Sequence, residues 1–187
     1  MSTLISTIKQ LDTRLNDHEQ YIRRDCFEIK DIPVEDEDTN QIVKQVAELI
    51  DVDIRESNIS ISHRLPVGKP WTDQTGRVHQ PREYATDFYN SRFKLKGQTI
   101  DDLECISSGV GNNIYVSESL NPSRKKLFRS CLKVKKELNY KFISTQYGQI
   151  FMKKDKSTPS IKISRLTDLA KLKSSRQQIP NYGLNGD

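Results

Sequence analysis

A heptad repeat of apolar side chains at the N-terminus constrains the fold more tightly than any other feature of the chain. Leu4, Ile8, Leu11, Leu15, His18 and Ile22 follow one another at alternating spacings of four and three residues. An α-helix with this repeat carries one apolar seam, which a second helix covers in a coiled coil. We therefore expect residues 1–23 to form a coiled-coil helix that self-associates as a dimer or trimer. Packing of the seam on the chain's own domain is the alternative. The residues expected to make the oligomer contacts are Leu4, Ile8, Leu11, Leu15 and Ile22.

The region after this helix has the pattern of a β-α-β unit. Phe27 and Ile29 alternate with charged residues before Pro33, which predicts a short strand. Residues 42–50 then place apolar side chains on one helical face, and residues 59–65 alternate again as a second strand. Residues 84–96 predict a helix with Tyr84, Phe88 and Leu95 facing inward, and residues 113–117 predict a strand. Residues 66–81 contain three prolines and two glycines without periodicity, which predicts a loop.

A basic helix is predicted to open the C-terminal third. Asn121 is a suitable N-cap and Pro122 suits the first helical position. Its apolar side chains recur on one side of the helix; they are Leu127, Cys131, Val134 and Leu138. Lys125, Arg129, Lys133 and Lys136 recur on the opposite side, with Lys126 beside them and Leu132 interrupting the stripe. The stripe indicates a binding surface for a polyanion. The alternative is a helix face that is only solvated.

A small sheet is predicted to follow this helix. Residues 141–145 and 149–153 flank Tyr147 and Gly148, which is typical of a hairpin. Residues 160–163 predict a third strand. A short helix is predicted from Leu166, Leu169 and Leu172, and a mobile tail is predicted over residues 174–187. We expect Tyr140, Phe142 and Tyr147 to belong to the hairpin core, with stacking on bases as the alternative.

Charge is distributed unevenly along the 187 residues. Residues 1–60 carry 7 Lys/Arg against 14 Asp/Glu, and residues 61–120 carry 7 against 7. Residues 121–176 carry 16 against 3, a net charge of +13. A basic segment on a neutral-to-acidic chain is typical of polyanion binding.

Several function classes lack their characteristic motifs. No phosphate-cradling glycine loop follows a strand, and His18, His63 and His79 have no partners at metal-ligand spacing, so we expect no enzyme, no cofactor and no metal site. Cys26, Cys105 and Cys131 are odd in number and widely spaced, which suits a reducing, intracellular location, nuclear or cytoplasmic. No apolar run is long enough to cross a membrane and no secretory signal is expected at the N-terminus.

Five segments occur together in an order that resembles a known group of proteins. They are YIRRDCFEIKDIP, ISISHRLP, FYNSRFKLK, NIYVSESLNPSRKKLFRSCLKVKKE and YKFISTQYGQIFMKK. Their order resembles proteins of the first reading frame of LINE-type non-LTR retrotransposons. The last two also resemble the C-terminal domain of the baculovirus few-polyhedra (FP) protein family. The resemblance implies a coiled coil, an RNA-recognition-motif-like domain and a basic C-terminal domain, which together bind nucleic acid as an oligomer.

The chain departs from this pattern at one place. Such proteins have an apolar strand between the HRLP-type strand and the FYNSRFKLK helix, whereas here a polar loop follows Leu65. The segment 77–79 is short and polar, so we expect the middle domain to lack a central strand. The aromatic signature of ordinary RNA-recognition motifs is absent as well.

These observations predict an α+β protein with three parts and a tail. They are a coiled-coil helix at 1–23, a degenerate RNA-recognition-motif-like domain at 24–120, a basic FP-like domain at 121–173 and the tail at 174–187. We expect sequence-independent, non-catalytic binding of single-stranded RNA or DNA; a coiled-coil scaffold whose basic block binds an acidic protein is the alternative. The residues expected to contact nucleic acid are Arg23, Arg24, Arg64, Lys125, Lys126, Arg129, Lys133, Lys136, Lys141, Lys153 and Lys154.

Overall fold

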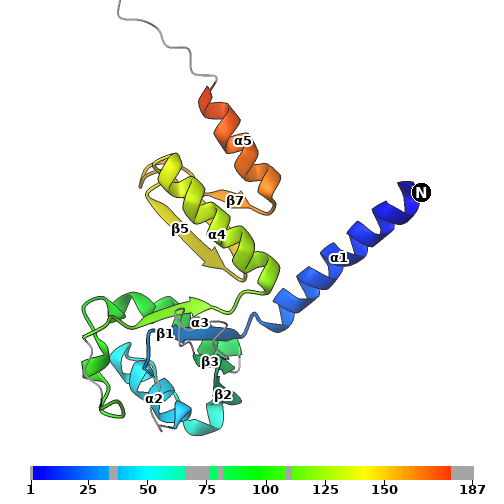
Figure 1. The fold of residues 1–187 in the computed structure, drawn as a ribbon. Helices are drawn as coiled ribbons and strands as arrows, with labels where there is room; N and C mark the ends of the chain where they lie inside the picture. Colours follow the sequence, from blue (N-terminus) through cyan, green and yellow to red (C-terminus); the bar gives the residue numbers. More distant parts are fainter. Residues whose placement is uncertain (1, 34–37, 66–75, 80–81, 108–110, 178–187) are drawn as a thin grey trace, which may run out of the picture. The chain divides into compact units, whose positions relative to one another are not determined.

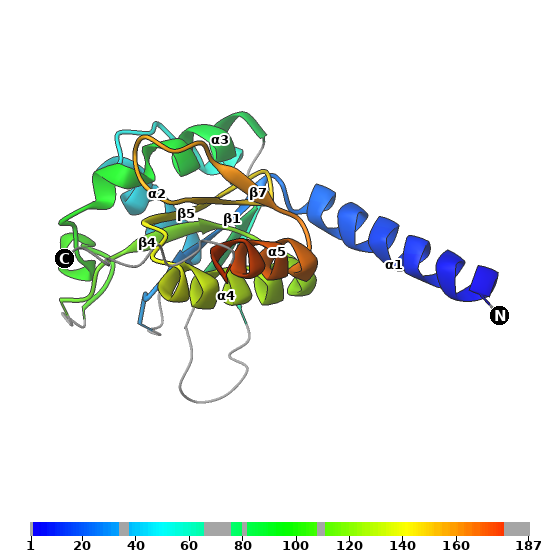
Figure 2. The same ribbon diagram turned by 90° about the horizontal axis from the view of Figure 1, so that it is seen from above.

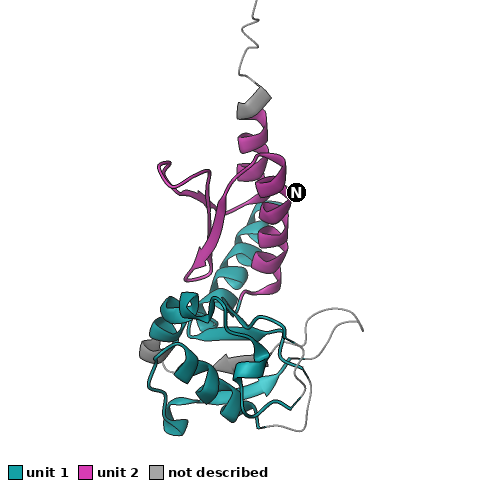
Figure 3. Cartoon of the chain, turned by 90° about the vertical axis from the view of Figure 1, so that its left-hand side faces the viewer, with its two compact units in different colours: residues 1–119 teal, residues 120–187 magenta. Residues whose placement is uncertain are grey.

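A computed structural model describes residues 2–33, 38–65, 76–79, 82–107 and 111–177. The chain divides into two compact units, residues 1–119 and residues 120–187 (Figure 3). Each unit has its own hydrophobic core and its own sheet. The division falls between residues 119 and 120, next to the boundary expected between residues 120 and 121, and helix α1 belongs to the first unit.

The N-terminal heptad segment is helical. Helix α1 runs from Ser2 to Ile22 (Figure 1). Its apolar seam is exposed in the single chain: Leu4 is 66% exposed, Leu11 57% and Leu15 59%. The helix is thus confirmed, while its association with another copy stays a prediction.

The remainder of the first unit alternates strands and helices. Its elements are β1 (Cys26–Lys30), α2 (Thr39–Leu49), β2 (Ile61–Arg64), β3 (Gly76–His79), α3 (Arg82–Ser91) and β4 (Tyr115–Glu118). Three 3-10 turns, η1 (Glu56–Asn58), η2 (Arg92–Leu95) and η3 (Ile100–Asp102), lie between them. The strands form one sheet in the order β2-β3-β1-β4, and all neighbours are antiparallel. The element order is therefore β-α-β-β-α-β.

The prediction that this sheet lacks a central strand is wrong. Residues 76–79, expected to be loop, form β3, which pairs with β1 on one side and β2 on the other. Val78 stands opposite both Phe27 and Ser62. A four-residue strand with one apolar residue has little strand propensity of its own. Hydrogen bonds from strands on both sides stabilise it instead, and β-propensity depends strongly on such context.

The core of the first unit lies between the sheet and helices α2 and α3. Phe27 of β1 stacks on Phe88 of α3, with ring centroids 4.1 Å apart. On α2, Ile42, Val43 and Val46 are buried in the same cluster, as the sequence periodicity predicts. The Asp38 side chain caps α2 by accepting a hydrogen bond from the Asn40 amide at 2.9 Å.

The second unit packs two helices on a three-stranded sheet. Its elements are α4 (Pro122–Glu137), β5 (Phe142–Gln146), β6 (Gln149–Lys153), β7 (Ile161–Ile163) and α5 (Leu166–Gln177). The sheet order is β5-β6-β7, all antiparallel. Figure 2 shows α4 and α5 on the same side of this sheet. Leu169 of α5 shares its core with Leu127 of α4 and Ile163 of β7.

The predicted elements of the second unit are confirmed, and one boundary is corrected. The Asn121 side chain accepts a hydrogen bond from the Arg124 amide at 2.8 Å, and Pro122 follows it as expected for a helix start. Tyr147 and Gly148 both have positive φ, 51° and 72°, as a two-residue hairpin turn requires. The predicted tail begins too early, because α5 extends to Gln177; residues 178–187 lie outside the described residues.

None of the helices within the described residues combines the length and the apolar character that crossing a membrane requires.

Candidate nucleic-acid interface

The basic stripe of α4 lies on the side of the helix that faces away from the core. Leu127, Cys131 and Val134 are buried against the sheet, which confirms the predicted apolar face. The exposed cations on the other side are Lys126, Arg129, Lys133 and Lys136, while Lys125 is half-buried. Four of these cations recur within three helical turns, so several phosphates of one strand are within their reach.

Arg124, which precedes the stripe, has a structural role that the sequence did not reveal. Its Nη1 atom donates a hydrogen bond to the carbonyl oxygen of Gly148 at 3.1 Å. This bond ties the first turn of α4 to the hairpin turn between β5 and β6. Arg124 therefore helps to fix the basic helix against the sheet.

The three lysines predicted from the hairpin lie at two places: Lys153 is within β6, and Lys141 and Lys154 lie at the open end of the hairpin. Lys153 stands directly opposite Phe142 on the face of the sheet that α4 does not cover. Lys141 and Lys154 are exposed and form the next pair beyond β5 and β6, with the Lys141 amide donating to the Lys154 carbonyl oxygen at 3.0 Å. Like charges opposite each other in a ladder repel, so an anion at this end of the hairpin would relieve their repulsion.

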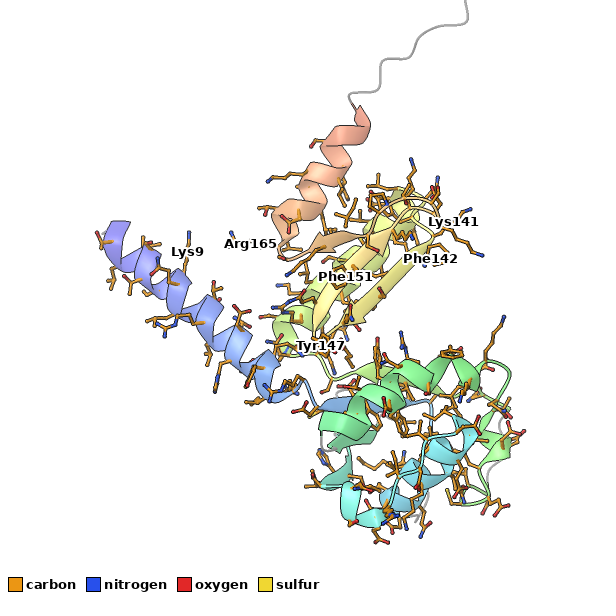
Figure 4. All side chains as sticks on the ribbon, turned by 180° about the vertical axis from the view of Figure 1, so that it is seen from behind. Lys9, Lys141, Phe142, Tyr147, Phe151 and Arg165 are labelled. Carbon is orange, nitrogen blue, oxygen red and sulfur yellow. The ribbon has the colours of Figure 1, made fainter. Side chains whose placement is uncertain are left out.

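The aromatic residues of the hairpin behave differently from one another. Tyr140 packs on the core, as predicted. The prediction of a core position is wrong for Phe142, which is 42% exposed, and for Tyr147, which is 57% exposed. Phe151, which the sequence did not single out, is half-buried on the same face as Phe142 (Figure 4).

Register explains why Phe142 is outside the core. Ile143 stands opposite Met152 and Thr145 opposite Ile150, so these positions form the helix-covered face. Residues alternate between the two faces along a strand, which places Phe142 and Phe151 on the open face. The two-residue turn at 147–148 sets this register. The register makes Lys153 the partner of Phe142, and this charged partner is the signal in the sequence for the open face.

Two of the three predicted arginines of the first unit, Arg24 and Arg64, make side-chain contacts within the unit. Arg64 donates from its Nη atoms to the carbonyl oxygens of Ile32 and Pro33 at 3.0 and 2.8 Å. The Arg24 guanidinium lies 3.7 Å from the centroid of the Tyr21 ring and pairs with Asp25 at 3.2 Å. Arg23 is half-buried. These contacts favour structural roles over phosphate binding, and the structure does not bring these arginines together with the α4 stripe into one unit.

The face of the first unit's sheet opposite α2 and α3 offers no aromatic platform on its two central strands. On β1 this face carries Cys26 and Glu28, which are 3% and 2% exposed. The Ser119 hydroxyl donates to Glu28 Oε1 at 3.2 Å. On β3 the corresponding register positions are Arg77 and His79. A buried carboxyl group in the middle of the face makes it unsuited to base stacking.

Metal binding has no evident site in the described part of the chain, and the Cys131 thiol is enclosed. No group of three or more His, Cys, Asp or Glu residues there has the arrangement to hold a metal ion. Cys131 is fully buried, and this burial raises the pKa of its thiol to about 11. A protonated, enclosed thiol is a poor nucleophile.

Comparison with known protein families gives a match within the second unit. Residues 121–173 match the family model described as Baculovirus FP protein domain 2. The matched segment begins at the N-cap of α4 and ends within α5, so it includes the basic stripe and the whole β5-β6-β7 sheet. This confirms the resemblance of the C-terminal part to FP proteins. No curated protein matches the chain in sequence.

Proposed function

We propose that the chain is a non-catalytic, sequence-independent binder of single-stranded nucleic acid that acts as an oligomer. The observation that carries the proposal is the exposed stripe on α4, within a segment of net charge +13. Lysine and arginine side chains that neutralise phosphates release condensed counterions, which drives binding without base recognition.

The first unit supports the proposal through its topology. Its β-α-β-β-α-β order, with β1 and β3 at the centre of the sheet, is the ferredoxin-like arrangement that RNA-recognition motifs share. We infer an RNA-recognition-motif-like domain without stacking aromatics on its central strands. Its contribution to binding would be to connect the N-terminal helix to the second unit along the chain rather than to hold bases.

The exposed seam of α1 supports the oligomeric part of the proposal. Joining several basic units raises the effective local concentration of binding sites on one strand. The order of the five sequence segments further supports an origin in the first reading frame of a LINE-type retrotransposon. A reverse-transcriptase frame downstream in the genome would support this origin, and an isolated host gene would argue against it.

Salt dependence tests the proposed function. Binding of the full chain to a fluorescent single strand should weaken with salt, with a log–log slope of about −3.5 if about five phosphates are neutralised. The variant Lys133→Glu/Lys136→Glu should bind more weakly to all sequences and show a slope shallower by about 1.4. The control is Lys9→Glu/Lys96→Glu, which changes the net charge by the same amount at two exposed lysines of the first unit. This variant should retain most of the affinity.

The alternative function, an adaptor for an acidic protein, predicts a different result. Heparin competes with either ligand, so competition by heparin does not separate the two. An acidic polypeptide that binds more tightly than a single strand of matched charge would contradict the proposal. Equal affinity of the Lys133→Glu/Lys136→Glu variant and the wild type, with the fold intact, would remove α4 from the interface.

A further inference from the structure

The open face of the β5-β6-β7 sheet is a second surface, distinct from the α4 stripe. It is the face that α4 and α5 do not cover (Figure 2). Register assigns its residues: Phe142 and Ser144 on β5, Phe151 and Lys153 on β6, and Lys162 on β7. Because α4 packs on the opposite face, its stripe and this surface point to opposite sides of the second unit.

Two phenylalanines lie next to each other on this face. Phe142 stands opposite Lys153, and Phe151 is two residues before Lys153 on the same strand. Phe142 and Phe151 are therefore diagonal neighbours on adjacent strands, within reach of each other for aromatic side chains. Phe142 remains 42% exposed although the helix-covered face of the same hairpin has a well-filled core. Figure 4 shows both side chains on the strands of this sheet.

Lysines stand beside both rings. Lys153 is the cross-strand partner of Phe142, and Lys162 is the cross-strand partner of Phe151. The strands β5, β6 and β7 contain no acidic residue. Each ring thus has a cation as its neighbour, so the face complements a ligand that alternates flat apolar groups with negative charges.

We propose that this open face is a base-stacking platform on which Phe142 and Phe151 hold unpaired bases while Lys153 and Lys162 neutralise the flanking phosphates. The inference rests on the proposed function and extends it by naming the surface that selects single strands. Aromatic rings stack on any base, which keeps binding independent of sequence. Bases in a duplex are already stacked on one another and present no free face, so the platform excludes duplexes. The α4 stripe, which meets phosphates alone, does not discriminate.

The test compares full-length variants for binding to a single strand and to a duplex at the same salt concentration. Phe142→Ala/Phe151→Ala should lower single-strand affinity by about tenfold or more, since stacking on each ring contributes measurably to affinity. Duplex affinity and the slope against salt should stay unchanged, because no charge is removed. Phe93→Ala is the control, because Phe93 is 72% exposed in the first unit and is not on the platform.

A second variant guards against loss of folding, because Phe151 is half-buried. Phe142→Leu/Phe151→Leu keeps apolar bulk on the sheet and removes the aromatic faces. Loss of single-strand preference in this variant, with an unchanged circular dichroism spectrum, supports the platform. Retention of the full preference overturns it, even where the wild type binds with the expected salt dependence.

The outcomes separate this inference from the function on which it rests. Failure of the wild type to bind any nucleic acid would contradict the proposed function itself. Weaker binding of a poly-glutamate probe in the leucine variant, with nucleic-acid binding unchanged, would overturn the platform and assign the face to an acidic protein.

Discussion

The Nε2 atom of Gln20 donates a hydrogen bond to the carbonyl oxygen of Ser119, 3.2 Å away. Ser119 also donates from its amide to the Cys26 carbonyl oxygen at 3.1 Å and from its hydroxyl to Glu28. All three side chains, of Gln20, Ser119 and Glu28, are buried. The end of α1, the central strand β1 and the last residue of the first unit are therefore held together by one polar network.

Removal of the Gln20 amide should destabilise the first unit. Gln20→Ala leaves the Ser119 carbonyl group without this donor, and losing a buried hydrogen bond costs about 1 kcal/mol. We expect a lower urea midpoint for the first unit. Gln10→Ala, at an exposed position on the same helix, should leave the midpoint unchanged or slightly raised, because alanine has the higher helix propensity. A similar loss in both variants would contradict a specific contribution of the network.

Charges in the seam of α1 should dissociate the oligomer. Leu11→Asp/Leu15→Asp places two carboxylates on a surface that a partner helix must bury, so the chain should sediment as a monomer. Gln10→Asp/Thr13→Asp adds the same charge outside the seam and should preserve the oligomer. A wild-type chain that sediments as a monomer at high micromolar concentration would contradict the coiled coil.

Interruption of β3 should loosen the first unit while leaving the second intact. Val78→Pro removes a backbone donor from a strand that is paired on both sides, and proline is poorly tolerated there. Hydrogen exchange should accelerate at β1 and β2, with a loss of about 1–3 kcal/mol. Amides of α4 report on the second unit as an internal reference. Unchanged protection of β1 would show that β3 does not complete the sheet.

High pH should destabilise the second unit through Cys131. Burial raises the pKa of its thiol from 9.0 to about 11, so the folded state retains a proton that the unfolded state releases. The resulting stability is complete below about pH 9 and is lost as the pH rises toward 11. In thermal unfolding, Cys131→Val should lose less stability than the wild type across this range, because the variant has no thiol to titrate. Lysine titration affects both proteins equally. Parallel curves for the two proteins would contradict the assignment.

Local sequence patterns predicted those elements whose own residues determine them. The cap at Asn121, the buried face of α4 and the turn at Tyr147 are each encoded within a few residues, and the structure confirms them. The sequence pattern did not predict strand β3, because GRVH has a single apolar residue and depends on the neighbouring strands for its hydrogen bonds.

The candidate site was predictable in part for the same reason. Helical spacing was sufficient to place Lys126, Arg129 and Lys133 on the exposed side of α4. The positions of Phe142 and Phe151 depended on the hairpin register, because both faces of the hairpin carry apolar residues. The inward contacts of Arg64 join residues more than 30 positions apart, and no local pattern encodes them.

The relative affinity of the full chain for a single strand and a duplex tests the central claim most directly. Both probes, each of about 20 nucleotides or base pairs, are titrated at one salt concentration; because the duplex carries the denser charge, phosphate contacts alone would favour the duplex. We predict that the single strand binds about tenfold more tightly or better, because unpaired bases are available to stack. Equal affinity, or preference for the duplex, would contradict the account.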